Sequence, residues 1–142
     1  MVNREFIAQR LLFIDSFLRG LYELSALDRD SFFSDKRNPA AGESFLRRAL
    51  EAIFDIGRHI LAKTGYKEMA GEYKAIAQGL KEIGIIDEEL REKLFQMAGY
   101  RNRLVHLYNV VSDEELYTVI STSLKDIEDF VSSIKEYLAR LK

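Results

Sequence analysis

The segment from Tyr100 to Tyr108 concentrates polar side chains in a stretch of chain that is otherwise apolar. The guanidinium of Arg101 is suited to binding a phosphate, and the imidazole of His106 is able to move a proton near neutral pH. Asn102 adds an amide that donates and accepts hydrogen bonds. These are the groups that cleavage of RNA without a metal ion needs, because RNA carries its own 2′-hydroxyl. Arg101, Asn102 and His106 are therefore the candidate catalytic residues.

A helical projection of this segment places Arg101 where an apolar side chain is expected. An unpaired buried charge is costly, so Arg101 requires a charged partner or a water-filled cavity. Asn102 and His106 lie one turn apart on the neighbouring stripe and are able to share a ligand. Gly99, one turn before Asn102, leaves room for something to approach. The inward stripe that Arg101 interrupts consists of Leu90, Leu94, Met97, Leu104 and Tyr108.

The step from Arg101 to His106 turns an ideal helix by about 140°, so the two side chains do not stack directly. Three arrangements resolve this. The arginine curls around the helix, the helix ends near His106, or the segment meets its copy from a second chain. We favour the last arrangement, combined with the reach of a long arginine side chain.

A second polar pair, Asp55 and His59, lies one helical turn apart elsewhere in the chain. It forms either a local hydrogen bond that orients a half-buried histidine or a support behind the catalytic residues. Arg103 adds positive potential next to Asn102. We expect no metal site, because two histidines 47 residues apart and no cysteine leave no zinc motif.

The composition indicates a soluble globular protein of a reducing compartment, and we expect it to be cytoplasmic. Apolar residues make up 47% of the 142 residues, charged residues 31%, and there is no cysteine. The longest apolar run near the N-terminus, Leu11–Ile14, is too short for a signal peptide or a membrane span. Because the net charge is −2, we expect no binding of DNA over the whole surface, and any contact with RNA must be local or transient.

The apolar spacing predicts an all-α fold, an antiparallel bundle of four long helices plus one short helix, in a single domain over residues 1–142. The first helix has two adjacent apolar stripes. That face suits either a central bundle helix or a helix that also packs against a second subunit. The expected helices cover about residues 3–26, 43–63, a short stretch within 67–83, 87–109 and an unbroken run from 112 to 141.

Turn and cap residues set the expected boundaries. The stretch Asp28–Gly42 has the composition of a connection, anchored by its two adjacent phenylalanines. Asp87 is the expected N-cap of the helix that carries the polar segment. Ser112 and Glu115 have the spacing of a capping box at the start of the last helix.

The pattern R-N-x-x-x-H-x-Y, formed by Arg101, Asn102, His106 and Tyr108, resembles the HEPN ribonucleases. The tyrosine two residues after the histidine narrows the resemblance to the HepT-like toxins. The likeness extends over nearly the whole chain, and the core motif shows no departure from it. It includes A-L-E-A-I-F-D-I-G-R-H-I at 49–60, G-I-I-D-E-E-L at 84–90 and M-A-G-Y-R-N-R-L-V-H-L-Y at 97–108.

The resemblance implies an activity and a partner that the spacing does not show. HEPN proteins are helical bundles that form homodimers, with the two arginine–histidine motifs facing one cleft, and they act as metal-independent RNA endonucleases without a cofactor. HepT-like members are toxins of type VII toxin–antitoxin systems. Their antitoxin, an MntA nucleotidyltransferase, attaches AMP to the motif tyrosine, which corresponds to Tyr108 here.

Two other functions remain open. The chain is alternatively a non-catalytic HEPN domain that binds a nucleotide or a nucleic acid through the same arginine and asparagine. It is otherwise an adaptor bundle for a nucleotidyltransferase, in which case the wide face of the first helix matters more than the motif.

Overall fold

The computed structural model describes residues 1–106 and 111–141. In these ranges the chain forms seven α-helices and one short 3₁₀ helix and no strand, which confirms the all-α class. The elements are α1 (Arg4–Ser25), α2 (Arg29–Ser34), α3 (Arg37–Lys63), η1 (Lys67–Met69), α4 (Tyr73–Glu82), α5 (Glu88–Val105), α6 (Asp113–Thr122) and α7 (Leu124–Arg140).

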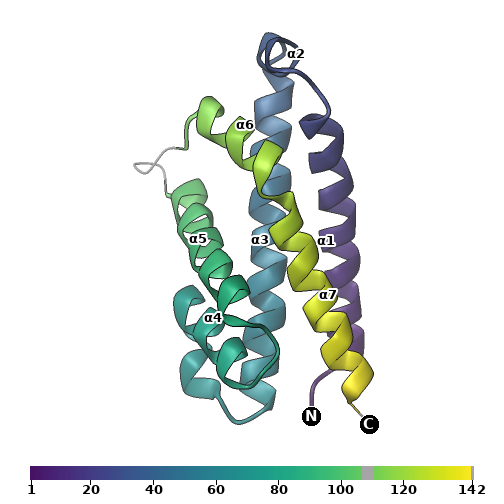
Figure 1. Ribbon diagram of the computed structural model, residues 1–142, viewed down its shortest axis with the longest axis vertical. Coiled ribbons are helices and arrows are strands. Elements are labelled where there is room, and N and C mark those ends of the chain that lie inside the picture. Colours follow the sequence, from purple (N-terminus) through teal and green to yellow (C-terminus); the bar gives the residue numbers. More distant parts are fainter. Residues whose placement is uncertain (107–110, 142) are drawn as a thin grey trace.

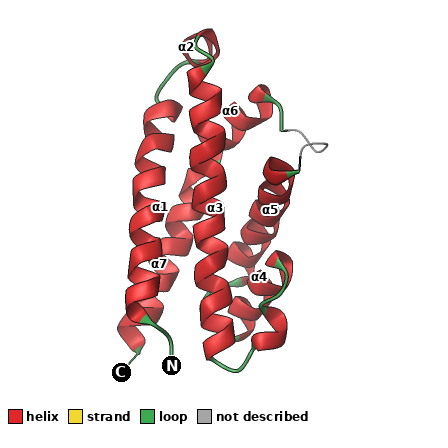
Figure 2. Cartoon of the chain, turned by 180° about the vertical axis from the view of Figure 1, so that it is seen from behind, coloured by secondary structure: helices red, strands yellow, loops and turns green. Residues whose placement is uncertain are grey.

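The long helices alternate in direction, so that α1, α3, α5 and α7 run up, down, up and down (Figure 1). Both termini therefore lie at the same end of the molecule. In both views α3 lies between α1 and α5 (Figure 1 and Figure 2). Within the described ranges no helix is long and apolar enough to span a bilayer.

Helix α3 forms the centre of the core because it is apolar on more than one face. The predicted inward stripe is confirmed, since Leu46, Leu50, Ile53, Gly57 and Ile60 are all buried. At Gly57, side chains of α4 pack directly against the backbone of α3. A Cβ atom at Gly57 would lie 2.5 Å from Cγ2 of Ile76 on α4, a distance that real Cβ atoms do not show. This close contact holds α4 against the lower half of α3.

The prediction of one unbroken last helix is wrong, because the helix ends at Thr122 and a new one starts at Leu124. Ser123 between them has φ −118° and ψ 3°. The break falls in a serine–threonine–serine run, whose side chains compete for backbone hydrogen bonds. Oγ1 of Thr122, for example, donates to the carbonyl of Thr118 at 2.7 Å. In the described ranges the four long helices α1, α3, α5 and α7 are present, but there are three short α-helices, α2, α4 and α6, where one was predicted.

The expectation that residues 28–42 form only a connection is also wrong, because this stretch contains α2 and the first turn of α3. The side chain of Asp28 caps α2 by accepting from the N–H of Ser31 at 2.8 Å. Helix α3 begins at Arg37. Pro39 does not prevent this start, because it falls in the first turn, where a missing N–H costs nothing. Phe32 is completely buried, as an anchor of this region should be.

The predicted caps on either side of the polar segment are present. Asp87 accepts from the N–H of Leu90 at 2.8 Å, and Ser112 accepts from the N–H of Glu115 at 3.1 Å. The carboxylate of Glu115 does not complete a capping box, because it accepts hydrogen bonds from Arg103 instead. Helix α5 ends at Val105, four residues before the predicted end near Asn109.

The outer face of α1 carries the second apolar stripe. The predicted second stripe consists of Phe6, Phe13, Phe17 and Leu24. Leu24 is buried, Phe6 and Phe17 are half-buried, and Phe13 is 43% exposed. Packing of a second subunit against it stays a prediction.

Candidate functional site

Helix α5 leaves the core before it reaches the polar segment. Leu90, Leu94, Met97 and Ala98 are buried, and the residues from Gly99 to His106 are half-buried or exposed. Arg101 continues the inward stripe but is only half-buried. The arginine therefore lies where the apolar core gives way to solvent, which lowers the cost of its charge.

The guanidinium of Arg101 packs against an aromatic ring. Its Cζ atom lies 4.7 Å from the ring centroid of Tyr73, at the start of α4. Such a cation–π contact contributes about 0.5–2 kcal/mol, depending on exposure. Among the described residues, Nε of Arg101 is the buried side-chain nitrogen without a hydrogen-bond partner. This N–H group thus has unused donor capacity inside the protein.

Arg101 and Asn102 line one open groove of about 560 Å³. The groove is bounded by the end of α3, the start of α4 and the second half of α5. Its cationic side chains outnumber its one carboxylate, although the chain as a whole is acidic. It therefore provides the local positive site that the composition required for contact with RNA. The lining residues are Arg58, Gly71, Glu72, Tyr73, Lys74, Arg101 and Asn102.

The Tyr73 ring also packs against an aromatic side chain of the hydrophobic core. It stacks on Phe54 of α3, with ring centroids 4.7 Å apart and planes at 30°. Phe54 is 1% exposed, so the stack extends from the hydrophobic core to the groove. A second guanidinium, that of Arg58, lies 5.7 Å from the same Tyr73 ring. Sequence reasoning missed Tyr73, Arg58 and Lys74, because α3, α4 and α5 bring them to Arg101 only in the fold.

His106 is the C-cap of α5 and is exposed. Its backbone has φ −98° and ψ 118°, and its N–H donates to the carbonyl of Asn102 at 3.2 Å. The helical projection therefore ends at Val105 and does not fix the direction of the imidazole. Of the three arrangements considered for Arg101 and His106, this is the one in which the helix ends near His106. His106 is not among the described residues that line the groove.

Asp55 and His59 make separate contacts rather than the local hydrogen bond that was one expectation. The carboxylate of Asp55 pairs with Arg10 of α1 at 3.4 Å and with Arg58 at 3.8 Å. Nε2 of His59 accepts from the backbone N–H of Asn3 at 2.8 Å. Asp55 therefore reaches the groove through Arg58, whereas His59 faces the N-terminus. Their role as support for catalysis stays a prediction.

His59 is adapted to its neutral form. Burial lowers the pKa of its imidazole, and the nearby charges of Lys63 and the N-terminal amine lower it further. The ring also lies 4.8 Å from that of Phe6. Protonation would remove the lone pair that accepts from Asn3, so the neutral ring holds the start of α1.

Arg103 lies on a different side of α5 from Arg101. Its guanidinium forms a two-pronged ion pair with Glu115 of α6, with one N···O distance of 2.8 Å. The hydrogen bonds from Arg103 lower the pKa of the Glu115 carboxyl. The pair connects α5 to α6 across the segment that joins them.

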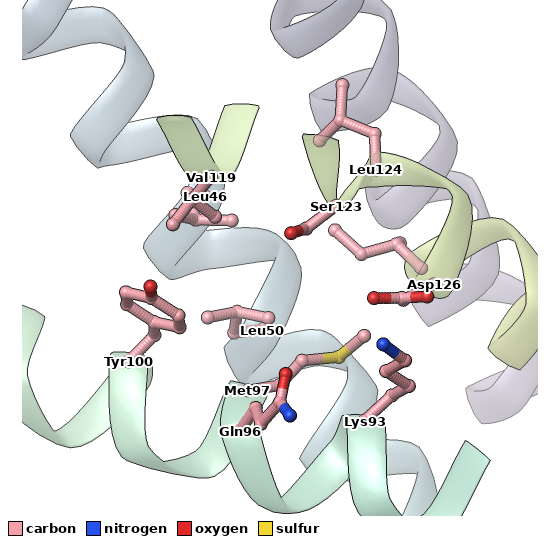
Figure 3. A pocket seen from close by; sticks show the side chains of 11 residues that line it. Leu46, Leu50, Lys93, Gln96, Met97, Tyr100, Val119, Ser123, Leu124 and Asp126 are labelled. Atoms are coloured by element: carbon pink, nitrogen blue, oxygen red, sulfur yellow. The ribbon is translucent and has the colours of Figure 1, made fainter. Parts of the chain in front are cut away.

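A small cavity lies behind α5, between α3 and the junction of α6 with α7 (Figure 3). Its volume of about 30 Å³ is enough for one or two water molecules and too small for a nucleotide. Tyr100, Met97 and Ser123 are among its lining residues. It is separate from the groove at Arg101.

Tyr108, the predicted site of AMP attachment, lies outside the described residues. In the described ranges, no group of three or more His, Asp or Glu side chains is placed to hold a metal ion.

Comparison with known proteins identifies the family. Residues 8–134 match the family described as Ribonuclease HepT-like, which covers most of the chain. The chain belongs to the HepT-like ribonuclease family. The predicted resemblance to HepT-like HEPN ribonucleases is thereby confirmed, and with it the assignment of the chain as a ribonuclease.

Two relatives of this HepT-like chain have names that state an activity. The "tRNA nuclease HepT" of Aphanizomenon flos-aquae is 28% identical over 96% of this chain and 92% of its own length. A "Putative RNase" of Archaeoglobus fulgidus is 31% identical over 68% of this chain and 72% of its own length.

Solved structures show the same fold at lower sequence identity. A tri-AMPylated Shewanella oneidensis HEPN toxin in complex with MNT antitoxin has a TM-score of 0.81 and 23% identity, covering 94% of this chain and 99% of its own. The cytosolic protein YutE of Bacillus subtilis, of unknown function, has a TM-score of 0.77 and 24% identity over 96% of this chain and 91% of its own.

Proposed function

We propose that this HepT-like ribonuclease is the toxin of a toxin–antitoxin pair and that it cleaves tRNA without a metal ion. The observation that carries the proposal is the placement of Arg101, half-buried against Tyr73 at the edge of a cationic groove. The choice of tRNA follows the name of the Aphanizomenon relative, which matches nearly the full chain.

The reaction uses the 2′-hydroxyl of the RNA as nucleophile. Its oxygen bonds to the adjacent phosphorus, its proton passes to an imidazole, and the bond from phosphorus to the 5′-oxygen breaks. The leaving 5′-oxygen takes a proton from an imidazolium. The products are a 2′,3′-cyclic phosphate and a 5′-hydroxyl end.

Each motif residue has a distinct role in this scheme. Arg101 binds the scissile phosphate and stabilises the extra negative charge of the transition state. Asn102, exposed at the same groove, donates a hydrogen bond to phosphate or orients the imidazole. His106 transfers the proton. Its position at the end of α5, away from the lining of the groove, suits a cleft in which two copies of the motif face each other. One histidine of a homodimer then acts as base and the other as acid.

The proposed antitoxin is an MntA-type nucleotidyltransferase that attaches AMP to Tyr108. Support comes from the matching fold of the Shewanella toxin, which is AMPylated and bound to its MNT antitoxin. AMP on Tyr108 would block the cleft by its bulk and by bringing negative charge where the RNA phosphate binds. Tyr108→Phe should keep nuclease activity and lose modification by the antitoxin. Equal incorporation of AMP into that variant would show that another residue is modified.

The test of the nuclease is incubation of purified protein with tRNA in the presence of EDTA, beside a His106→Ala variant of matched circular dichroism. The unaltered protein should produce fragments and the variant should not. Full activity in the variant would rule out the mechanism. Binding of tRNA without fragments would favour the non-catalytic alternative, and no binding would favour an adaptor for a nucleotidyltransferase.

A further inference from the structure

Two guanidinium groups from different helices share one aromatic ring in the groove. The Cζ atoms of Arg58, on α3, and Arg101, on α5, lie 5.7 and 4.7 Å from the ring centroid of Tyr73. All three residues line the groove. Like charges repel, so two guanidinium groups held around one ring create a site that favours an anion.

Resting on the ribonuclease function proposed above, we propose that Arg58 is a second phosphate-binding residue. It binds the RNA backbone phosphate next to the one held by Arg101. Tyr73 is a positioning residue, because its ring contacts both guanidinium groups and fixes their separation.

Arg58 keeps donors available for this role. Its Nε donates to the backbone carbonyl of Ala70 at 3.0 Å, which orients the plane of the guanidinium. The nearest oxygen of Asp55 is 3.8 Å from its Nη1, too long for a hydrogen bond. The side chain is 44% exposed. A guanidinium anchored through Nε therefore presents its terminal N–H groups to the groove, an arrangement suited to two-pronged binding of phosphate.

The ring of Tyr73 is unsuited to stacking on a nucleobase. Phe54 stacks on it at 4.7 Å, and the Arg101 guanidinium lies at the same distance from its centroid. A base would have to displace one of these groups. The groove therefore favours recognition of the RNA backbone over recognition of its bases.

The test of Arg58 is the salt dependence of tRNA binding, measured on the inert His106→Ala background. Removing one cation that binds a phosphate should reduce the slope of log K against log salt concentration by about 0.7–0.9. Arg58→Gln and Arg58→Met, which keeps the aliphatic stem, should both show this reduction. Arg58→Lys should restore the slope, because it keeps the charge although it lacks the Nε bond to Ala70.

The matched control is Arg19→Gln. Arg19 pairs with Asp15 on α1, which lies on the other side of α3 from α5, so its removal should leave the slope unchanged. A slope that is unchanged in both neutral variants of Arg58 would overturn the assignment while leaving the nuclease intact. Failure of the His106→Ala protein itself to bind tRNA, with no cleavage by the unaltered protein, would instead reject the proposed function.

The test of Tyr73 separates positioning from folding by kinetics on the active protein. Tyr73→Phe keeps the ring that contacts both guanidinium groups, so its KM should lie well below that of Tyr73→Leu. Tyr73→Leu removes the ring and should raise KM on the order of tenfold, in line with removal of a cation–π interaction. A merely structural role predicts a lower kcat from a smaller folded fraction at unchanged KM, and that result would contradict the assignment.

Discussion

At the scale of single residues, Arg101 and Arg103 form a natural pair for comparison. They are two positions apart on α5, yet Arg101 faces the groove with Tyr73 and Arg103 faces Glu115. The same residue type thus has a proposed chemical role at one position and a structural one at the other.

Neutral substitution should separate these two roles. Arg101→Gln should lower kcat for tRNA cleavage by about 10²–10³-fold, because it removes a donor to the transition-state charge. Arg103→Gln should lower the stability only slightly, as expected for a partly exposed ion pair, and leave kcat nearly unchanged. Urea unfolding and single-turnover cleavage measure the two effects. Equal losses of kcat in both variants would remove the distinction.

His59 makes the stability of α1 dependent on pH. Its pKa in the folded protein is lowered, so the unfolded chain takes up the proton first as the pH falls. The contribution of His59 is therefore present above its unfolded pKa of about 6.5 and is lost as the pH falls below it. The free energy of unfolding of the unaltered protein, relative to His59→Gln, should shrink between about pH 7.5 and about pH 5.5. A difference that stays constant over this range would contradict the assignment.

The sequence was informative about which side chains matter and less so about their neighbours. Because Arg101 interrupts an apolar stripe, the sequence indicated that it needs a charged partner or a water-filled cavity. The open groove at Arg101 corresponds to the cavity. The contacts of Asp55 were not predictable, because Arg10 comes from another helix and competes for the carboxylate. Tyr73 carried no local signal, since its importance arises only where α4 crosses α5.

At the scale of elements, the fold depends on close approach between α3 and α4. A Cβ atom at Gly57 would meet Ile76 at 2.5 Å and Leu80 at 3.2 Å, whereas one at Gly99 would meet nothing within 4 Å. The two glycines therefore predict opposite effects of the same substitution.

Gly57→Ala should destabilise the protein by about 1–3 kcal/mol, because α4 must move away from α3. It should also weaken tRNA binding, since α4 carries Tyr73. Gly99→Ala should stabilise the protein by about 0.5–1 kcal/mol, the usual gain in a helix interior. Urea unfolding of the two variants measures both, and a Gly57→Ala protein as stable as the unaltered one would show that the contact is relaxed.

The positions of the long helices were predictable from apolar spacing, and the starts of α5 and α6 were predictable from their side-chain caps, whereas the cap that Asp28 provides to α2 was missed. Asp87 and Ser112 were found because their side chains accept from the backbone. The break at Ser123 was missed because apolar residues continue across it at helical spacing. The start of α3 was missed because Pro39 suggests a loop, although the first turn of a helix accepts it.

At the scale of the whole molecule, the proposed cleft needs two chains. Co-refolding equal amounts of unaltered protein and His106→Ala should place roughly half of the unaltered chains in mixed dimers. If one histidine acts as base and the other as acid, the activity per unaltered chain should fall by about half. Co-refolding with Arg19→Gln is the control. Unchanged activity after exchange would mean that each chain cleaves RNA alone.

The most direct test of the central claim is the chemistry of the cut ends. A tRNA substrate is cleaved in EDTA, the fragment ends are analysed, and a matched substrate carries a 2′-deoxy nucleotide at the cut site. Attack by the 2′-hydroxyl, with His106 moving the proton and Arg101 on the phosphate, predicts 2′,3′-cyclic phosphate and 5′-hydroxyl ends and no cleavage of the deoxy substrate. Fragments with 3′-hydroxyl and 5′-phosphate ends, or cleavage of the deoxy substrate, would contradict it.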